Sequence, residues 1–230
     1  NIMKIVVTDL TRFSNPDLVC LAGIDIETGK CIRPLPYLPM QFVKENNILP
    51  SDILESNFIS KGSSNPHAED CSYENISKLG IATTYDFEAI LSRDLSTSIS
   101  HGFNYNFSEK KIPIGFAPNK SIITIKLNTS QIKIVNNIHD ATKIKLHLND
   151  NDGREYPFLP ITDLGFHSYF LQNNSNLNFI NEVNNFIRSY QDVYLRVGLA
   201  REYQGAYWLQ INGIYLFSTY RINHIFRDKV

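Results

Sequence analysis

Short runs of β-branched and apolar residues recur along this chain, and turn residues bound most of them. Runs of four to eight such residues are typical of β-strands, whereas helices repeat apolar residues every three to four positions over longer stretches. The pattern predicts strands over residues 3–11, 18–26, 31–35, 53–60, 121–127, 131–135, 142–148, 155–162, 193–200 and 206–217. We therefore expect a mainly β protein with a minor α component.

Helical periodicity is confined to two segments. Residues 176–190 keep one apolar face at helical spacing, and Ser175 is the predicted N-cap. Residues 86–92 form the second predicted helix. Between them, residues 95–120 are rich in Ser, Asn, Gly and Pro with scattered Phe, which indicates a long ordered connection whose aromatic rings need a packing surface.

The order of these elements favours a particular architecture. Five or so antiparallel strands with one helix before the last two is the order of an OB-fold barrel. We expect two tandem OB-like antiparallel β-barrels, each with an inserted helix: residues 3–135, with long connecting loops, and residues 136–230, with the 176–190 helix. Other small β-barrels give the same alternation of residues, so the pattern alone does not select this topology.

Charge limits what a chain of this kind binds. The 230 residues include 22 Lys and Arg against 23 Asp and Glu, a net charge of −1. A protein that coats phosphates over a broad surface carries an excess of basic residues, so that class is excluded. A small local groove that relies on stacking remains compatible, and 14 Phe and 12 Tyr supply rings. We expect a cytoplasmic protein without membrane contact, because no apolar stretch approaches the roughly 20 residues that cross a bilayer.

Cofactor and metal motifs are missing from the sequence. The three cysteines have no CxxC spacing, so neither a disulfide framework nor a zinc site is predicted. The chain contains no P-loop, no GxGxxG after a strand, no GxSxG and no HExxH. We therefore expect no cofactor and no bound metal.

The predicted carboxyl-terminal hairpin offers candidate ligand-binding residues. Arg196 lies on the strand face opposite the apolar residues Val193, Leu195, Val197 and Leu199. It therefore points outward or into a groove between domains, close to Arg201, Tyr203 and Trp208. Bases stack on aromatic rings with about 1–3 kcal/mol each, and Arg contacts phosphate. The alternative is that these rings cover the barrel or dock one barrel on the other.

Arg12 and Arg33 form a predicted basic edge on the amino-terminal half. Both follow or lie within predicted strands, where a phosphate contact is a candidate role. The alternative is that they form salt bridges with Asp9 or Asp25.

One loop is a candidate catalytic segment. His67, Glu69 and Asp70 lie within four residues of one another, and imidazole and carboxylates at short spacing suit acid–base catalysis or a divalent metal. The sequence contains no second cluster of His or Asp at a spacing that indicates further catalytic residues or metal ligands. A structural role, in which the carboxylates accept backbone N–H groups, is the favoured interpretation.

Four segments carry a resemblance to a known family: KIVVTDLTRFSN, VCLAGIDIETGKCIRPLP, the PHAED loop and VYLRVGLAREYQGAYWLQINGIYLF. Together they resemble a bacterial family of dual OB-domain proteins, over nearly the whole chain from Met3 to Tyr220. The resemblance implies two tandem OB barrels and a role in binding nucleic acid or a nucleotide. It also implies association with prokaryotic defence and mobile-element loci.

The expected function is therefore non-catalytic recognition of single-stranded nucleic acid or a nucleotide. Two alternatives remain at this point. One is an enzyme that acts on nucleotides or nucleic acid through the loop with His67, Glu69 and Asp70. The other is an adaptor that binds a partner protein through residues 95–120.

Overall fold

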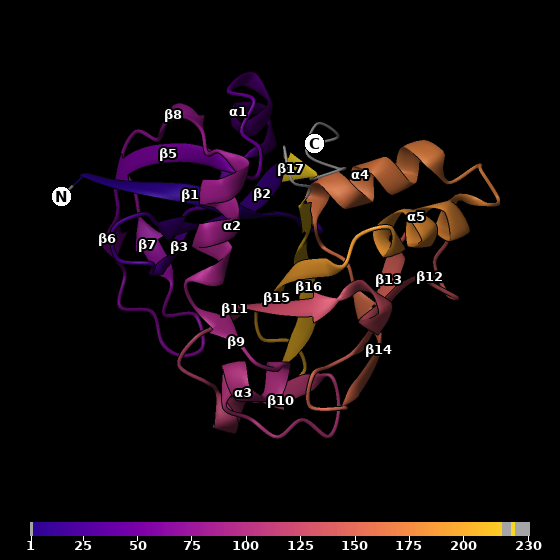
Figure 1. The fold of residues 1–230 in the computed structure, drawn as a ribbon. Helices are drawn as coiled ribbons and strands as arrows, with labels where there is room; N and C mark the ends of the chain where they lie inside the picture. The colour runs from indigo at the N-terminus through magenta and orange to yellow at the C-terminus, as the bar shows by residue number, and fades with distance from the viewer. Residues whose placement is uncertain (1, 218–221, 224–230) are drawn as a thin grey trace.

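A computed structural model describes residues 2–217 and 222–223, whose strands form three sheets (Figure 1). The amino-terminal half contains an eight-stranded sheet with the order β6-β7-β3-β2-β1-β5-β8, and β4 pairs with β2. Its strands are β1 (Ile2–Arg12), β2 (Leu18–Asp25), β3 (Cys31–Pro34), β4 (Leu38–Pro39), β5 (Asp52–Asn57), β6 (Ile59–Ser60), β7 (Asp70–Ser72) and β8 (Ser77–Ile81).

The carboxyl-terminal half contains two sheets, β10-β16-β15-β11-β9 with β17 paired to β16, and β12-β13-β14. Their strands are β9 (Leu95–Ser96), β10 (Lys111–Pro113), β11 (Ile122–Asn128), β12 (Ile132–Asn136), β13 (Ile144–Asn149), β14 (Glu155–Pro160), β15 (Asp192–Leu199), β16 (Ala206–Phe217) and β17 (Ile222–Asn223). Each predicted strand is found within a few residues of its predicted bounds. The prediction of a mainly β chain with a minor α component is confirmed.

Five helices and two 3-10 turns complete the described residues: α1 (Met40–Glu45), α2 (Thr84–Ser92), α3 (Ile99–Phe103), η1 (Ile114–Phe116), η2 (Thr129–Gln131), α4 (Leu164–Asn173) and α5 (Phe179–Arg188). The predicted helices correspond to α2 and α5. The predicted cap at Ser175 is wrong, because a turn precedes the helix and Asn178 is its N-cap. None of these helices is long and apolar enough to span a bilayer.

A bulge in β1 directs a charged side chain away from the core of its own half. The register with β2 shifts between Val7 and Asp9, so Thr8 is an extra residue in this strand. Ile5 and Val7 face the core before the bulge, and Leu10 faces it afterwards. Strict alternation would place Asp9 in that core, whereas the bulge turns it towards the carboxyl-terminal half.

Each half has its own hydrophobic core, and a third cluster joins them. Phe103 and Phe107 pack in the carboxyl-terminal core, so the connection over 95–120 does find a packing surface for its rings. The joining cluster includes Phe87 of α2 together with Tyr194 of β15 and Tyr215 of β16. Burial of this apolar surface stabilises one relative placement of the halves.

The predicted closed barrels are not found, because the hydrogen-bonded sheets of the described residues are open. In the first half, Phe58 separates β5 from β6. In the second half, Ile161, which follows β14, pairs with Ile211 of β16 through one isolated bridge. The predicted inserted helix of the first half, α2, follows the last strand of its sheet, β8. The helix that lies between strands of this half is α1, between β4 and β5. The domain boundary at 135–136 stays a prediction, and residues 224–230 of that second domain lie outside the described residues.

Gly23 in β2 is expected to tolerate no side chain. A Cβ atom there would lie 2.7 Å from the carbonyl oxygen of Val6. Gly23→Ala should therefore lower the free energy of unfolding by about 1–3 kcal/mol, because overpacking pushes the paired strands apart. Gly80→Ala in β8 is the matched control, since nothing lies within 4 Å of its Cβ position. Urea denaturation measures both, and equal stabilities would contradict the expectation.

Candidate functional site

The junction between the halves contains a buried ion pair between Arg196 of β15 and Asp9 of β1. Nε of Arg196 lies 2.8 Å from Oδ1 of Asp9, and the two side chains are 3% and 1% exposed. Arg196 also donates to Oγ1 of Thr124 at 2.9 Å and to Sγ of Cys31 at 3.3 Å. Asn212 donates to Oδ2 of Asp9 at 3.0 Å. Burial lowers the guanidinium pKa of Arg196, but Asp9 and, to a smaller extent, Cys31 outweigh it and raise that pKa overall.

The loop between β6 and β7 closes the same junction with two carboxylates. Oδ1 of Asp70 lies 2.6 Å from Nε of Arg33, and Arg201 donates to both carboxylate oxygens at 2.9 and 3.1 Å. Glu69 accepts from the backbone N–H and the hydroxyl of Ser121 at 2.6 and 2.9 Å. Burial raises the pKa of Asp70, but the two guanidinium groups outweigh it and lower the pKa overall.

Three predicted ligand-binding residues, Arg33, Arg196 and Arg201, thus meet at this junction. Arg196 faces a groove between the halves, which is one of its two predicted orientations. Arg33 forms its ion pair with Asp70, whereas the sequence analysis considered Asp9 or Asp25. These guanidinium groups already donate to groups of the protein, so the structure gives them a role in joining the two halves.

His67 of the candidate catalytic loop is buried, with 8% of the residue exposed. Its ring packs edge-on against Tyr207 at 5.7 Å, and neither ring nitrogen has a hydrogen-bond partner among the described residues. Burial lowers the imidazole pKa to about 3, and Arg201 adds to the shift. No group of three or more His, Cys, Asp or Glu side chains in the described part of the chain is arranged to hold a metal ion. The loop therefore has the structure of a packed connection.

The buried His67 predicts an acid-sensitive stability. Its pKa is near 6.5 in an unfolded chain and about 3 in the folded protein. Between these values the unfolded chain binds the extra proton, so stability falls as the pH drops from 7 towards 4. His67→Phe should lose less stability over this window, whereas His139→Phe, at an exposed position, should behave like the wild type. Urea denaturation at pH 7 and pH 4.5 measures the difference, which is absent if the expectation is wrong.

Arg196→Met should destabilise the protein by about 3–5 kcal/mol, because it leaves Asp9 buried without a compensating charge. The double variant Arg196→Met, Asp9→Asn should recover part of this loss, since the uncompensated charge is then removed as well. A double-mutant cycle from urea denaturation measures the coupling. Strictly additive effects of the two substitutions would contradict a coupled pair.

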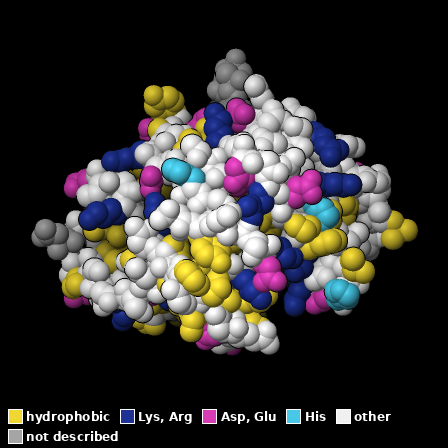
Figure 2. All heavy atoms as spheres, turned by 90° about the horizontal axis from the view of Figure 1, so that it is seen from below, with side chains coloured by type: hydrophobic (Ala, Val, Ile, Leu, Met, Phe, Trp, Pro, Cys, Tyr) yellow, Lys and Arg dark blue, Asp and Glu magenta, His cyan; other side chains and the backbone are white. Residues whose placement is uncertain are grey.

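A second candidate surface, the basic face, lies over β13 and its neighbours. Burial lowers the pKa of Lys145, and repulsion from nearby cations lowers it further. Lys133 of β12 lies opposite His147 of β13 in the same sheet. We define the basic face by Arg12, Lys110, Lys133, Lys143, Lys145, His147 and Phe158. Figure 2 shows the molecule from below, where Lys and Arg side chains gather beside hydrophobic ones.

A bulge places an aromatic ring on this face. The register between β13 and β14 shifts between Leu146 and Leu148, opposite Phe158 in β14. Phe158 has a φ of 54°, which is rare for a bulky residue, and its ring lies 4.4 Å from that of His147. Lys110 donates to the carbonyl oxygen of Phe158 at 3.4 Å. Bulges and strained backbone often aim side chains at binding sites.

Two hollows border β14 on either side of Tyr156. One has a volume of about 350 Å³ and is lined in part by Lys111, Arg154 and Trp208. Lys111 Nζ lies 4.8 Å from the centre of the Trp208 ring. The other has a volume of about 280 Å³ and is lined in part by Lys133. Both hollows thus contain cationic and aromatic side chains, together with Glu155, and Lys111 also pairs with Glu109 at 3.0 Å.

The basic face includes some predicted residues and adds others. Arg12 belongs to it, and Trp208 lines the adjoining hollow, whereas Tyr203 is 62% exposed on the loop before β16. Lys145 and Phe158 are not among the binding residues predicted from the sequence. Basic residues at every second position of the predicted strand over 142–148, Lys143, Lys145 and His147, were the available signal, although alternation alone does not distinguish a binding face from a solvated one.

Comparison with known proteins identifies the class. A family model described as "Dual OB-containing domain" matches residues 3–214, so the chain belongs to that family and the predicted resemblance is confirmed. No curated protein matches the chain. Among solved structures, a murine DNA-binding protein bound with double-stranded DNA is similar over 93% of this chain and 92% of its own, at 7% identity and a TM-score of 0.35. A TM-score this low carries no argument about fold or ligand.

Proposed function

We propose that this protein is a non-catalytic binding protein that holds single-stranded nucleic acid along the basic face. The observation that carries the proposal is the cluster of Arg12, Lys110, Lys143 and Lys145 beside the ring of Phe158, whose carbonyl oxygen accepts from Lys110 at 3.4 Å. Burial lowers the pKa of Lys145, and the neighbouring cations lower it further. Among these cations, Lys143 has an ion-pair partner, Asp140 at 3.3 Å. Holding like charges together costs free energy, and a phosphate backbone between them relieves it.

The finer fold proposal is two OB units whose rings are incomplete. In the second unit the ladder runs from β12 through β13 to β14, passes to β16 by the isolated bridge, and returns through β15 to β11. OB folds bind oligonucleotides on the face of their second and third strands. In this order those strands are β13 and β14, which carry the basic face.

The same pairing supports a domain boundary different from 135–136. β9 and β10 pair with β11 and β16, so both belong to the carboxyl-terminal sheet. We propose a boundary between the end of α2 at Ser92 and the start of β9 at Leu95. The second unit then contains the whole basic face except Arg12.

The near-neutral total charge is consistent with this surface because the charges are distributed unevenly. Asp9, Glu69 and Asp70 lie at the junction and accept from groups of the protein itself. The lysines of the basic face lie on and beside β12 and β13, and none of them contacts these three carboxylates. We expect modest affinity and a shallow salt dependence, because few phosphates are contacted at once.

Phe158 and Trp208 would supply the stacking part of the binding energy. Both rings are partly exposed, and each lies next to a lysine, Lys110 and Lys111 respectively. Stacking on an aromatic ring tolerates any base, so this arrangement predicts weak sequence preference.

The proposal predicts separate effects of charge and stacking on binding to a labelled single-stranded decanucleotide. Lys145→Gln should weaken binding and reduce the slope of log K against log salt by about 0.7, the value for one phosphate contact on a single strand. Phe158→Ala should cost about 1–3 kcal/mol at every salt concentration, with the slope unchanged. Fluorescence anisotropy from 50 to 200 mM salt measures both.

Lys61→Gln is the matched control for this experiment, because it removes one positive charge at an exposed position of the other half. Its affinity should change less than that of Lys145→Gln. Binding that is undetectable at tens of micromolar protein, or equal effects of the two lysine substitutions, would contradict the proposal. Tighter binding of duplex than of single strands would contradict its single-strand part.

A further inference from the structure

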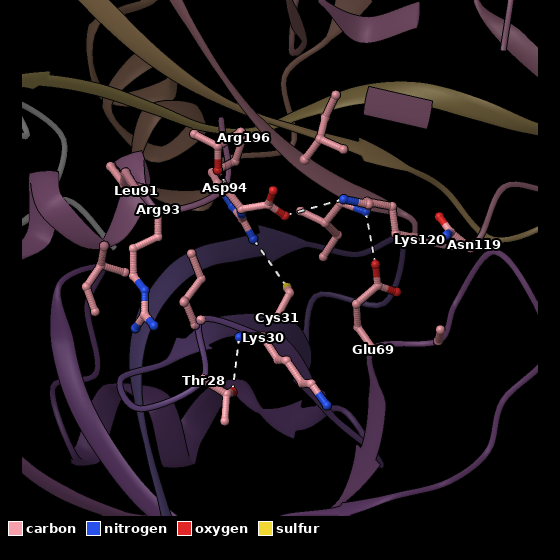
Figure 3. A pocket seen from close by; sticks show the side chains of 17 residues that line it. Thr28, Lys30, Cys31, Glu69, Leu91, Arg93, Asp94, Asn119, Lys120 and Arg196 are labelled. Atoms are coloured by element: carbon pink, nitrogen blue, oxygen red, sulfur yellow. Dashed lines mark hydrogen bonds and ion pairs between the residues drawn. The ribbon is translucent and has the colours of Figure 1, made fainter. Parts of the chain in front are cut away.

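A cleft of about 530 Å³ lies between the halves, away from the basic face (Figure 3). The turn between β2 and β3 contributes Lys30, the start of β3 contributes Cys31, and the end of α2 contributes Arg93. The segment before β11 contributes Asn119 and Lys120 on the opposite side. Ligand pockets of proteins have volumes of about 300–1,000 Å³, so a compact organic molecule fits here.

Two positive charges at the cleft have no carboxylate partner among the described residues. Nζ of Lys30 has no hydrogen-bond or ion-pair partner there. Arg93 donates to the carbonyl oxygens of Ile26 and Glu27 at 2.6 and 3.1 Å, which satisfies N–H groups but leaves the charge uncompensated. Lys120, by contrast, pairs with Asp94 at 3.4 Å. The cleft therefore offers an anionic group two cations that the protein itself does not neutralise.

Arg196 adds hydrogen-bond donors between the two sides of the cleft. A guanidinium group has five N–H donors. In Arg196, Nε donates to Asp9, Nη1 to Thr124 and Nη2 to Cys31, which uses three of the five. Burial raises the pKa of the Cys31 thiol to about 12, despite the opposing effect of Arg196. The thiol is therefore neutral at pH 7 and adds neither a negative charge nor a nucleophile to the cleft.

Apolar residues line the cleft from both sides. Ile24, Ile90 and Leu91 come from β2 and α2, and Ile122 and Ile123 come from β11. At the edge of the cleft the side-chain amide of Asn119, which has both donors and an acceptor, forms no hydrogen bond with the described residues. Apolar side chains with a free amide beside them match a flat ring whose edge carries hydrogen-bonding groups.

We propose that this cleft binds a free nucleoside phosphate. The phosphate lies between Lys30 and Arg93, the base packs against the isoleucines, and Asn119 bonds to the edge of the base. This site is separate from the basic face and does not depend on nucleic-acid binding there. A bound ligand would contact α2, the β2–β3 turn and the segment before β11, and would therefore link the two halves.

Isothermal titration calorimetry with AMP, GMP, CMP, UMP and ADP tests the proposal, with adenosine and inorganic pyrophosphate as partial ligands. At least one nucleotide should bind to the wild-type protein. Adenosine alone and pyrophosphate alone should each bind at least tenfold more weakly than that nucleotide. Lys30→Gln should weaken nucleotide binding about tenfold, because it removes a charge-assisted contact. Asn119→Ala should change the order of preference among the bases.

Lys44→Gln, an exposed lysine of α1 outside the cleft, is the matched control and should bind as the wild type does. Lys145→Gln should also leave nucleotide binding unchanged, which separates this site from the basic face. The proposal is overturned if no nucleotide binds at 1 mM, if pyrophosphate binds as tightly as ADP, or if Lys30→Gln and Lys44→Gln behave alike. Binding of a 5′-phosphorylated hexanucleotide without binding of any mononucleotide would overturn it as well.

Discussion

The relative placement of the two halves depends on the buried pair of Arg196 and Asp9. Removing two charges from water is costly, and the attraction between them recovers this cost only when neighbouring groups complete their hydrogen bonds. Here Thr124 and Asn212 do so, and Thr8 donates to Asp9 at 2.7 Å. Because each of these partners comes from a different segment, the pair is satisfied in one arrangement of the halves only. Its main consequence is therefore specificity of docking.

The arginines of the junction differ in their contacts from the lysines of the two proposed sites. Arg33, Arg196 and Arg201 donate several N–H groups each within the junction, where a planar guanidinium matches carboxylates in a fixed geometry. Lys30 is exposed at the cleft and Lys145 is partly buried at the basic face, and neither ammonium group has a carboxylate partner among the described residues. A sum of charges close to zero conceals this difference, because much of the acidic charge is used inside the protein.

Docking of the halves also creates two surfaces of different kinds. The basic face lies on the second unit, and only Arg12 comes from the first. The cleft exists only where the two units meet, since its walls come from α2, the β2–β3 turn and the segment before β11. Its volume of about 530 Å³ and its mixed polar and apolar lining favour a small ligand. Nucleic-acid binding is therefore proposed for a surface of the second unit, and nucleotide binding for the cleft between the two units.

The sequence by itself determined the strands, two of the three longest helices and the family, because alternation and helical spacing are local consequences of which side chains must be buried. It did not determine α4 (Leu164–Asn173). It also determined that Arg196 lies opposite the apolar face of its strand. The tertiary structure alone decided that this arginine meets Asp9, because a one-residue bulge at Thr8 reverses the expected face and leaves no mark in the alternation. It likewise decided that Phe158 lies over His147, since the shift of register depends on pairing between strands. Local pattern specifies elements, whereas the sites depend on bulges and contacts between residues far apart in the chain.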